Sequence, residues 1–131
     1  PDIAPLICYE IIFPGAMGTE RPGLAVNVTN DAWYGHTPGP WQHLRLAQVR
    51  AAETGVPVVR AANNGISAFI DGYGRIISAT PLDAVAVLDQ PLPAVRPPTL
   101  YSLHGSRIVF GVFLLLLAIA GLTNLLRRSS M

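Results

Sequence analysis

The chain has 131 residues, half of them hydrophobic, and a formal net charge of +1 at pH 7. Its nine positive side chains are all arginines and form no long basic run, which excludes the charge pattern of a nucleic-acid-binding protein. A single cysteine excludes an internal disulfide, and three scattered histidines give no zinc-like spacing, so no metal or other cofactor is expected.

Short apolar runs separated by glycine, proline and asparagine predict several strands in the first ninety residues. The predicted strands cover residues 3–7, 24–29, 57–62, 67–70, 75–80 and 84–88. The sequence Asp71-Gly72-Tyr73-Gly74 indicates a hairpin turn, and Gly65 is expected to need a positive φ in the turn that starts at Asn63. This order predicts a mixed α/β domain over residues 1–89.

One helix is predicted between the second and third strands. Pro40 suits the first turn of a helix because its missing N–H needs no partner there. The helix is expected to end at Thr54, before Gly55, with Trp41 and Leu44 on its buried face together with Ala47 and Ala51.

The last forty residues change in composition. Residues 90–107 are rich in proline and predict a linker, and residues 108–126 are apolar and uncharged. At ~1.5 Å rise per residue this segment spans about 28 Å, which predicts a transmembrane helix rather than a buried core helix. The short basic tail, residues 127–131, favours a cytoplasmic C-terminus with residues 1–107 on the outer side. Because the chain starts at Pro1 without an initiator methionine, we expect it to be the C-terminal part of a longer protein.

Cys8 directly follows the first predicted strand. Catalytic groups gather at the carboxyl ends of strands in α/β proteins, so Cys8 is a candidate nucleophile. The alternative is a small buried hydrophobic residue, which is the commoner role of a lone thiol. A reactive thiol needs a base and a cation, and the chain has no lysine. Its partners would therefore lie outside this chain or be His36 or His43, brought close by the fold.

Several motifs resemble those of the nitrilase (carbon-nitrogen hydrolase) superfamily, and more narrowly those of its membrane-bound branch, the apolipoprotein N-acyltransferases. They are ICYE (7–10), NVTNDAWYG (27–35), GPWQH (39–43), RAAE (50–53), RAANNGIS (60–67) and DGYG (71–74). The resemblance covers nearly all of the chain. It implies part of an αββα sandwich followed by one C-terminal transmembrane helix, in a multi-pass protein of the bacterial inner membrane whose catalytic domain faces the periplasm.

The resemblance also implies an activity. Its members move a fatty acyl chain from a phospholipid, through a cysteine thioester, to the α-amino group of the N-terminal diacylglyceryl-cysteine of apolipoproteins. By this resemblance Cys8 would be the nucleophile of a Glu-Lys-Cys triad, the backbone N–H of Tyr9 would help to bind the oxyanion, and Glu10 would orient the site. The triad Glu and Lys precede the cysteine in the family and have no counterpart here, so the chain alone is expected to be inactive.

Three residues are candidates for substrate binding. Trp33 and Tyr34 are amphipathic rings that suit guidance of acyl chains at a membrane surface, although ordinary packing beside the site explains them equally well. Asn64 lies in a loop that borders the site by resemblance.

Three other polar residues have open roles. Asp31 is expected to cap a turn or to hold the loop near the thiol. His43 is expected to be a hydrogen-bonded structural residue, and Arg60 to meet either an acidic partner or a lipid phosphate.

Two further functions remain open from the sequence. A membrane-tethered nitrilase-type amidase would resolve the thioester with water instead of an amine. A non-catalytic, membrane-anchored remnant would bind a partner and need no reactive thiol.

Overall fold

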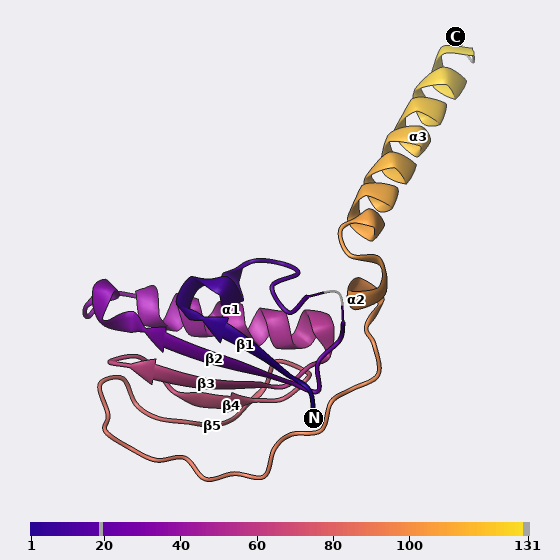
Figure 1. Ribbon diagram of the computed structural model, residues 1–131. Coiled ribbons are helices and arrows are strands. Elements are labelled where there is room, and N and C mark those ends of the chain that lie inside the picture. Colours follow the sequence, from indigo (N-terminus) through magenta and orange to yellow (C-terminus); the bar gives the residue numbers. More distant parts are fainter. Residues whose placement is uncertain (19, 130–131) are drawn as a thin grey trace. The chain divides into compact units, whose positions relative to one another are not determined.

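The computed structural model describes residues 1–18 and 20–129, with side chains up to residue 123 (Figure 1). It divides into two compact units, Pro1–Thr99 and Leu100–Met131, which are described separately.

The first unit is built on one five-stranded sheet. Its strands lie in the order β1-β2-β3-β4-β5; the first three are parallel, and β4 and β5 join antiparallel. The strands are β1 (Ile3–Ile7), β2 (Leu24–Asn30), β3 (Val58–Asn63), β4 (Ala68–Ile70) and β5 (Ile76–Ala79). Five of the six predicted strands are therefore present within about a residue of their predicted ends, and the mixed α/β class is confirmed.

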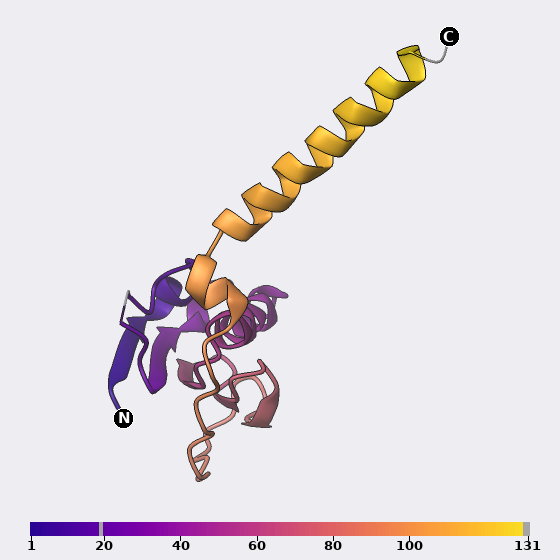
Figure 2. The ribbon, with the colours of Figure 1, turned by 90° about the vertical axis from the view of Figure 1, so that its right-hand side faces the viewer.

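The helix α1 (Gly39–Thr54) connects β2 to β3 and lies along one face of the sheet (Figures 1 and 2). Pro40 occupies its first turn, and Gly55 ends it in a left-handed conformation with φ 72°. Leu44, Ala47 and Ala51 are buried as expected, among the buried side chains of the sheet. Trp41 is 49% exposed, so its predicted place in the core is wrong. Pro40 and His43 take the buried positions in the first turn instead.

The sixth predicted strand, residues 84–88, is absent from the structure, and residues 84–99 form no helix or strand. Val85 and Val87 are fully or almost fully exposed, and the segment does not pair with β5, which is the edge strand of the sheet. The proline-rich segment that follows returns to the end of α1. The backbone N–H of Arg96 donates to the carbonyl of Gly55 at 2.9 Å, and the Arg21 guanidinium also donates to Gly55, at 3.2 Å. Thr99 donates to the carbonyl of Glu53.

The predicted hairpin between β4 and β5 is present, and Asp71 stabilises its turn. The carboxylate of Asp71 accepts hydrogen bonds from the backbone N–H groups of Tyr73 and Arg75, each at 2.9 Å, and from the Arg75 side chain at 2.7 Å. Burial alone would raise the pKa of the Asp71 carboxyl, but these hydrogen bonds outweigh it and lower the pKa below its usual value.

The Asp71 turn is expected to make stability depend on pH. A carboxyl whose pKa is lower in the folded than in the unfolded state stabilises the fold above its ordinary pKa of about 4, and this contribution is lost as the pH falls through the folded value. Asp71→Asn in the full-length protein should lower the thermal midpoint at pH 7 and flatten its fall below pH ~4. Asp89→Asn, at an exposed residue, is the control; equal acid sensitivity in both variants would contradict this assignment.

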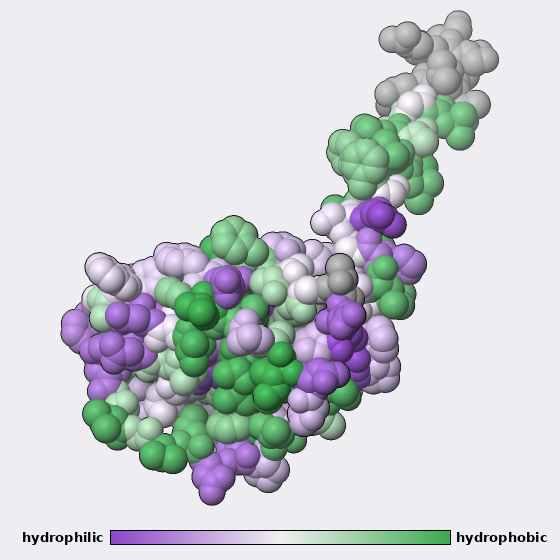
Figure 3. Space-filling model, in the orientation of Figure 1, coloured by the Kyte–Doolittle hydropathy of each residue, from purple (hydrophilic) through white to green (hydrophobic). Residues whose placement is uncertain are grey.

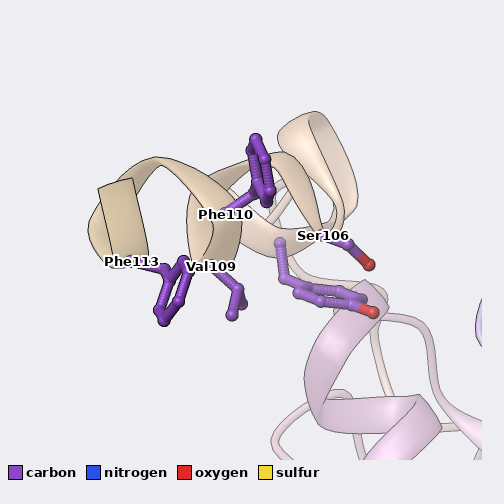
Figure 4. A pocket seen from close by; sticks show the side chains of 5 residues that line it. Ser106, Val109, Phe110 and Phe113 are labelled. Atoms are coloured by element: carbon purple, nitrogen blue, oxygen red, sulfur yellow. The ribbon is translucent and has the colours of Figure 1, made fainter. Parts of the chain in front are cut away.

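The second unit contains two helices, α2 (Leu100–His104) and α3 (Arg107–Ser129), joined through Gly105 at φ 56°. The short helix α2 was not expected within the predicted linker. The described side chains of α3 are mostly apolar and exposed (Figure 3). Where the two helices meet, the rings of Tyr101, Phe110 and Phe113 line a shallow apolar groove (Figure 4).

The predicted transmembrane segment, residues 108–126, lies within α3. Among the residues with described side chains, no helix is both long enough and apolar enough to span a membrane. Those residues end at 123, so the last part of the segment and the basic tail lie outside them. The span therefore stays a prediction.

Candidate functional site

Cys8 lies at the carboxyl end of β1, as the sequence predicts. Because β1, β2 and β3 are parallel, the residues that follow these strands meet at the same edge of the sheet. Cys8 is partly buried and has a left-handed backbone, with φ 49°. A residue other than glycine rarely adopts this conformation, and such strain gathers at functional sites.

A short helical turn, η1 (Cys8–Ile12), follows the thiol. The carboxylate of Glu10 turns back and accepts a hydrogen bond from the backbone N–H of Ile7 at 2.6 Å. Glu10 thereby ties the last residue of β1 to the turn that presents Cys8. This contact fits the orienting role expected for Glu10, and a direct role in the chemistry remains a prediction.

Five buried polar side chains lie beneath the turn. They come from four elements: Asn27 and Thr29 from β2, Asp31 from η2 (Asp31–Tyr34), His43 from α1 and Arg60 from β3. We call this set the polar cluster.

Asp31 is the centre of the polar cluster. Its Oδ2 accepts from Nη2 of Arg60 at 2.6 Å, and its Oδ1 lies 2.9 Å from Nδ1 of His43. The hydroxyl of Thr29 lies 3.1 Å from the same Oδ1. Arg60 also donates through Nη1 to Oδ1 of Asn27 at 2.5 Å. Arg60 therefore meets an acidic partner, which was one of its two expected roles, and Asp31 and His43 hold the loop near the thiol.

The polar cluster contacts Cys8 at two places. The hydroxyl of Thr29 lies 3.4 Å from Sγ, within reach of a weak hydrogen bond to sulfur. The backbone carbonyl of Cys8 receives Nδ2 of Asn27 and Nε2 of His43, each at 3.3 Å. The thiol and its own peptide group are therefore held from the interior.

The electrostatics of the site follow from burial. Burial lowers the pKa of the Arg60 guanidinium, and the neighbouring Asp31 carboxylate opposes this shift. Because an arginine starts so far above neutral pH, Arg60 remains the buried cation of the site. Burial raises the pKa of the Tyr34 hydroxyl, and the Tyr9 hydroxyl beside it adds to the shift, so Tyr34 stays neutral at physiological pH.

Two tyrosine rings pack against His43 of the polar cluster. The Tyr9 ring stacks on His43 with centroids 5.5 Å apart, and Tyr34 meets the same imidazole edge-on at 5.9 Å. The centroids of the two tyrosine rings lie 6.2 Å apart. Tyr34, expected at the substrate, is therefore beside Tyr9 and the thiol turn.

The other two expected substrate-binding residues lie differently. Trp33 is 87% exposed, so ordinary packing does not explain it and its side chain is free to meet another surface. Asn64 has a left-handed backbone with φ 54°, and its side chain reaches Asp83 at 3.5 Å. Their roles in substrate binding remain predictions.

The turn after β3 differs from expectation at one residue. The positive φ falls on Asn64, and Gly65 is required for space: a Cβ on Gly65 would lie 2.3 Å from Oδ2 of Asp31. Gly65→Ala in the full-length protein is therefore expected to displace the Asp31 carboxylate and to destabilise the domain by about 1–3 kcal/mol. Thermal unfolding measures the loss. Gly111→Ala, where a Cβ would meet nothing within 4 Å, is the control, and equal midpoints in the two variants would contradict this close approach.

Two members of the polar cluster, Asn27 and Thr29, are not among the site residues predicted from the sequence. Both are polar residues on a strand whose other residues are mainly apolar, and they alternate with Val26 and Val28. Since alternate residues of a strand face the same side, this spacing places two polar groups on one buried face and was the available signal.

Over the described residues, no three His, Cys, Asp or Glu side chains are grouped to hold a metal ion.

Comparison with curated proteins gives matches of high identity. The chain is 62% identical over 96 residues to the apolipoprotein N-acyltransferase of Brucella melitensis, which covers 72% of this chain and 18% of that protein. It is 52% identical over 107 residues to that of Bradyrhizobium diazoefficiens, covering 80% of this chain and 20% of the relative. It is 47% identical over 123 residues to the apolipoprotein N-acyltransferase of Allorhizobium ampelinum, covering 92% of this chain and 23% of the relative. The chain thus spans about a fifth of the length of these relatives.

Two solved structures of an amidase mutant from Nesterenkonia sp. AN1 share the fold. In one, which carries an acetamide moiety on its active-site cysteine, the TM-score is 0.50 at 21% identity, over 62% of this chain and 34% of that one. In the other, in which acrylamide has added to the active-site cysteine, the TM-score is 0.53 at 19% identity. The match covers 85% of this chain and 44% of that one. The Carbon-nitrogen hydrolase family matches residues 2–96. The chain therefore belongs to the carbon-nitrogen hydrolase family.

Proposed function

We propose that this chain is the part of an apolipoprotein N-acyltransferase that carries the nucleophilic cysteine. The observation that supports this most is the placement of Cys8. It combines a left-handed backbone at the carboxyl edge of the sheet with a buried polar cluster that holds its peptide. The identity of 47–62% to curated apolipoprotein N-acyltransferases favours this activity within the family.

The proposed reaction has two steps. The Cys8 thiolate attacks the ester carbonyl of a phospholipid, so that a C–S bond forms, the C–O bond breaks, and the lysophospholipid leaves with a proton from the general acid. The α-amino group of the diacylglyceryl-cysteine of an apolipoprotein then attacks the thioester. A C–N bond forms, the C–S bond breaks, the amine gives up a proton to the base, and the thiolate is restored.

Residues of this chain perform part of the proposed chemistry. In the proposal the N–H of Tyr9 binds the oxyanion of each tetrahedral intermediate. Glu10 holds the turn through Ile7, and Tyr34 and Trp33 face the acyl chain with Asn64 at the rim. The general base and a lysine that stabilises the oxyanion come from the remainder of the protein, since this chain contains no lysine.

We propose further that residues 108–126 anchor the domain in the bacterial inner membrane, with the catalytic domain in the periplasm and the C-terminus in the cytoplasm. Supporting this, the described side chains of α3 are mostly apolar and exposed, and both substrates are lipids of the bilayer. Deleting residues 108–131 from the full-length enzyme should lower its activity on bilayer substrates, because the domain loses its attachment to the bilayer on this side. Full activity on bilayer substrates after this deletion would contradict the anchor.

The acceptor distinguishes this function from an amidase. The full-length enzyme in proteoliposomes, given phospholipid and a synthetic diacylglyceryl-cysteine peptide, should form N-acyl peptide in preference to free fatty acid. Release of fatty acid at an equal rate with and without the peptide would indicate that water resolves the thioester, and would overturn the transferase assignment.

A further inference from the structure

The Cys8 carbonyl is the acceptor of two buried donors that the proposed reaction does not use. Nδ2 of Asn27 and Nε2 of His43 each lie 3.3 Å from its oxygen. A carbonyl oxygen has two lone pairs and can accept from both. Since a carbonyl only accepts, His43 must carry a hydrogen on Nε2 in this contact. The peptide group that follows the nucleophile is therefore clamped from inside.

The two donors are themselves fixed. With its hydrogen on Nε2, His43 accepts through Nδ1 from Nη2 of Arg60 at 3.2 Å, and Oδ1 of Asn27 accepts from Nη1 of Arg60 at 2.5 Å. Arg60 and Asp31 are joined at 2.6 Å and fully buried. Neither donor can turn without breaking a buried hydrogen bond, so the clamp is preorganised.

The planarity of the peptide group means that holding the Cys8 carbonyl also fixes the direction of the Tyr9 N–H. The C=O of Cys8 and the N–H of Tyr9 belong to one planar trans peptide group and point in opposite directions. A carbonyl held towards the polar cluster therefore directs the N–H of Tyr9 away from it, on the side where the thiol meets its substrate. Hydrogen bonds to the carbonyl also polarise the peptide and strengthen its N–H as a donor.

We propose that His43 and Asn27 are positioning residues that aim the N–H of Tyr9 at the developing oxyanion by clamping the carbonyl of Cys8. This inference rests on the proposed function, in which Cys8 carries the acyl group. The clamp also explains how Cys8 keeps φ at 49°, a conformation that its own backbone does not favour.

Two reactions of the same thiol separate positioning of the oxyanion donor from general damage. Acylation of Cys8 by a phospholipid builds an oxyanion, whereas alkylation by iodoacetamide displaces iodide from a saturated carbon and builds none. Loss of the clamp should slow acylation alone. Loss of thiol reactivity would slow both, and thermal unfolding of each variant checks separately that the fold is kept.

The variants are made at His43 in the full-length enzyme. The amide nitrogen of glutamine can reach the place of Nε2, whereas that of asparagine reaches only the place of Nδ1. His43→Asn is expected to slow single-turnover acylation about 10- to 100-fold, part of the loss typical for an oxyanion donor, with alkylation unchanged. His43→Gln should recover most of the acylation rate. Gln42→Ala, at the exposed neighbouring residue, is the control for changes to α1.

Asn27→Asp tests the other donor, because an aspartate still accepts from Arg60 but has no N–H group to donate to the Cys8 carbonyl. This variant replaces His43→Asn if His43→Asn does not fold. Acylation at the wild-type rate in a folded variant that lacks the donor, or a parallel fall of acylation and alkylation, would overturn the inference. A wild-type enzyme that forms no thioester at Cys8 would overturn the proposed function itself, and this inference with it.

Discussion

Replacing Cys8 by alanine in the full-length enzyme is expected to abolish acyl transfer, with a loss of at least about 10³-fold. No other side chain in this chain can carry a thioester, because Cys8 is its only cysteine. The reaction would then depend on bound lipid and amine meeting directly, without a covalent intermediate. Production of N-acyl peptide from phospholipid in proteoliposomes measures the loss.

Cys8→Ser refines this expectation. Serine keeps the size of the side chain, but an alkoxide is far harder to form than a thiolate, so most of the activity should also be lost. Both variants should keep the fold, because the polar cluster holds the peptide of residue 8 through its backbone carbonyl. Substantial turnover by Cys8→Ala would contradict the mechanism whatever the stability of the variant.

Asp31→Asn is expected to produce the largest loss of stability. This substitution keeps the shape of the side chain but leaves Arg60 as a buried cation without a counter-charge. Removal of one partner of a buried ion pair costs about 3–5 kcal/mol, because the remaining charge is neither solvated nor paired. Each kcal/mol lowers the thermal midpoint by roughly 2–4 °C for a domain of about 150–250 residues. Thermal unfolding of the full-length protein should therefore show a midpoint lower by on the order of 10 °C.

A double variant separates the loss of the pair from the cost of the orphaned charge. Arg60→Met combined with Asp31→Asn removes the buried cation, so it should be more stable than Asp31→Asn alone. Glu53→Gln, which removes the partner of Arg50 in an ion pair whose carboxylate side chain is 23% exposed, is the comparison and should cost less than Asp31→Asn. Equal losses of stability in Asp31→Asn and Glu53→Gln would contradict the larger contribution expected of the buried Asp31–Arg60 pair.

The sheet and helix were largely predictable, because their signals are local. Alternating β-branched residues marked β2, Pro40 and Gly55 marked the ends of α1, and the Asp71 turn marked the hairpin. The missing strand at 84–88 shows the limit of such patterns: its composition suits a strand, but pairing with the open edge of β5 depends on the path of the chain, which local composition does not set.

The candidate site was predictable only in part. Cys8 could be placed at a strand end from its sequence neighbours. The contacts of the polar cluster, however, join residues far apart in the chain: 35 positions separate His43 from Cys8, and 29 separate Arg60 from Asp31. Such pairings depend on strand order and on the path of α1. The requirement for Gly65 was predicted for the wrong reason, since it arises from the approach of Asp31 and not from a positive φ.

The most direct test of the proposed mechanism is the chemical state of Cys8 in the full-length enzyme. Mass spectrometry of the Cys8 peptide from the full-length protein in phospholipid proteoliposomes without acceptor, with and without neutral hydroxylamine, reads this state. We expect a fatty acyl adduct on Cys8 that hydroxylamine removes, since thioesters are cleaved under these conditions. A Cys8 that remains a free thiol when phospholipid is present and acceptor is withheld would contradict the claim that this residue carries the acyl group.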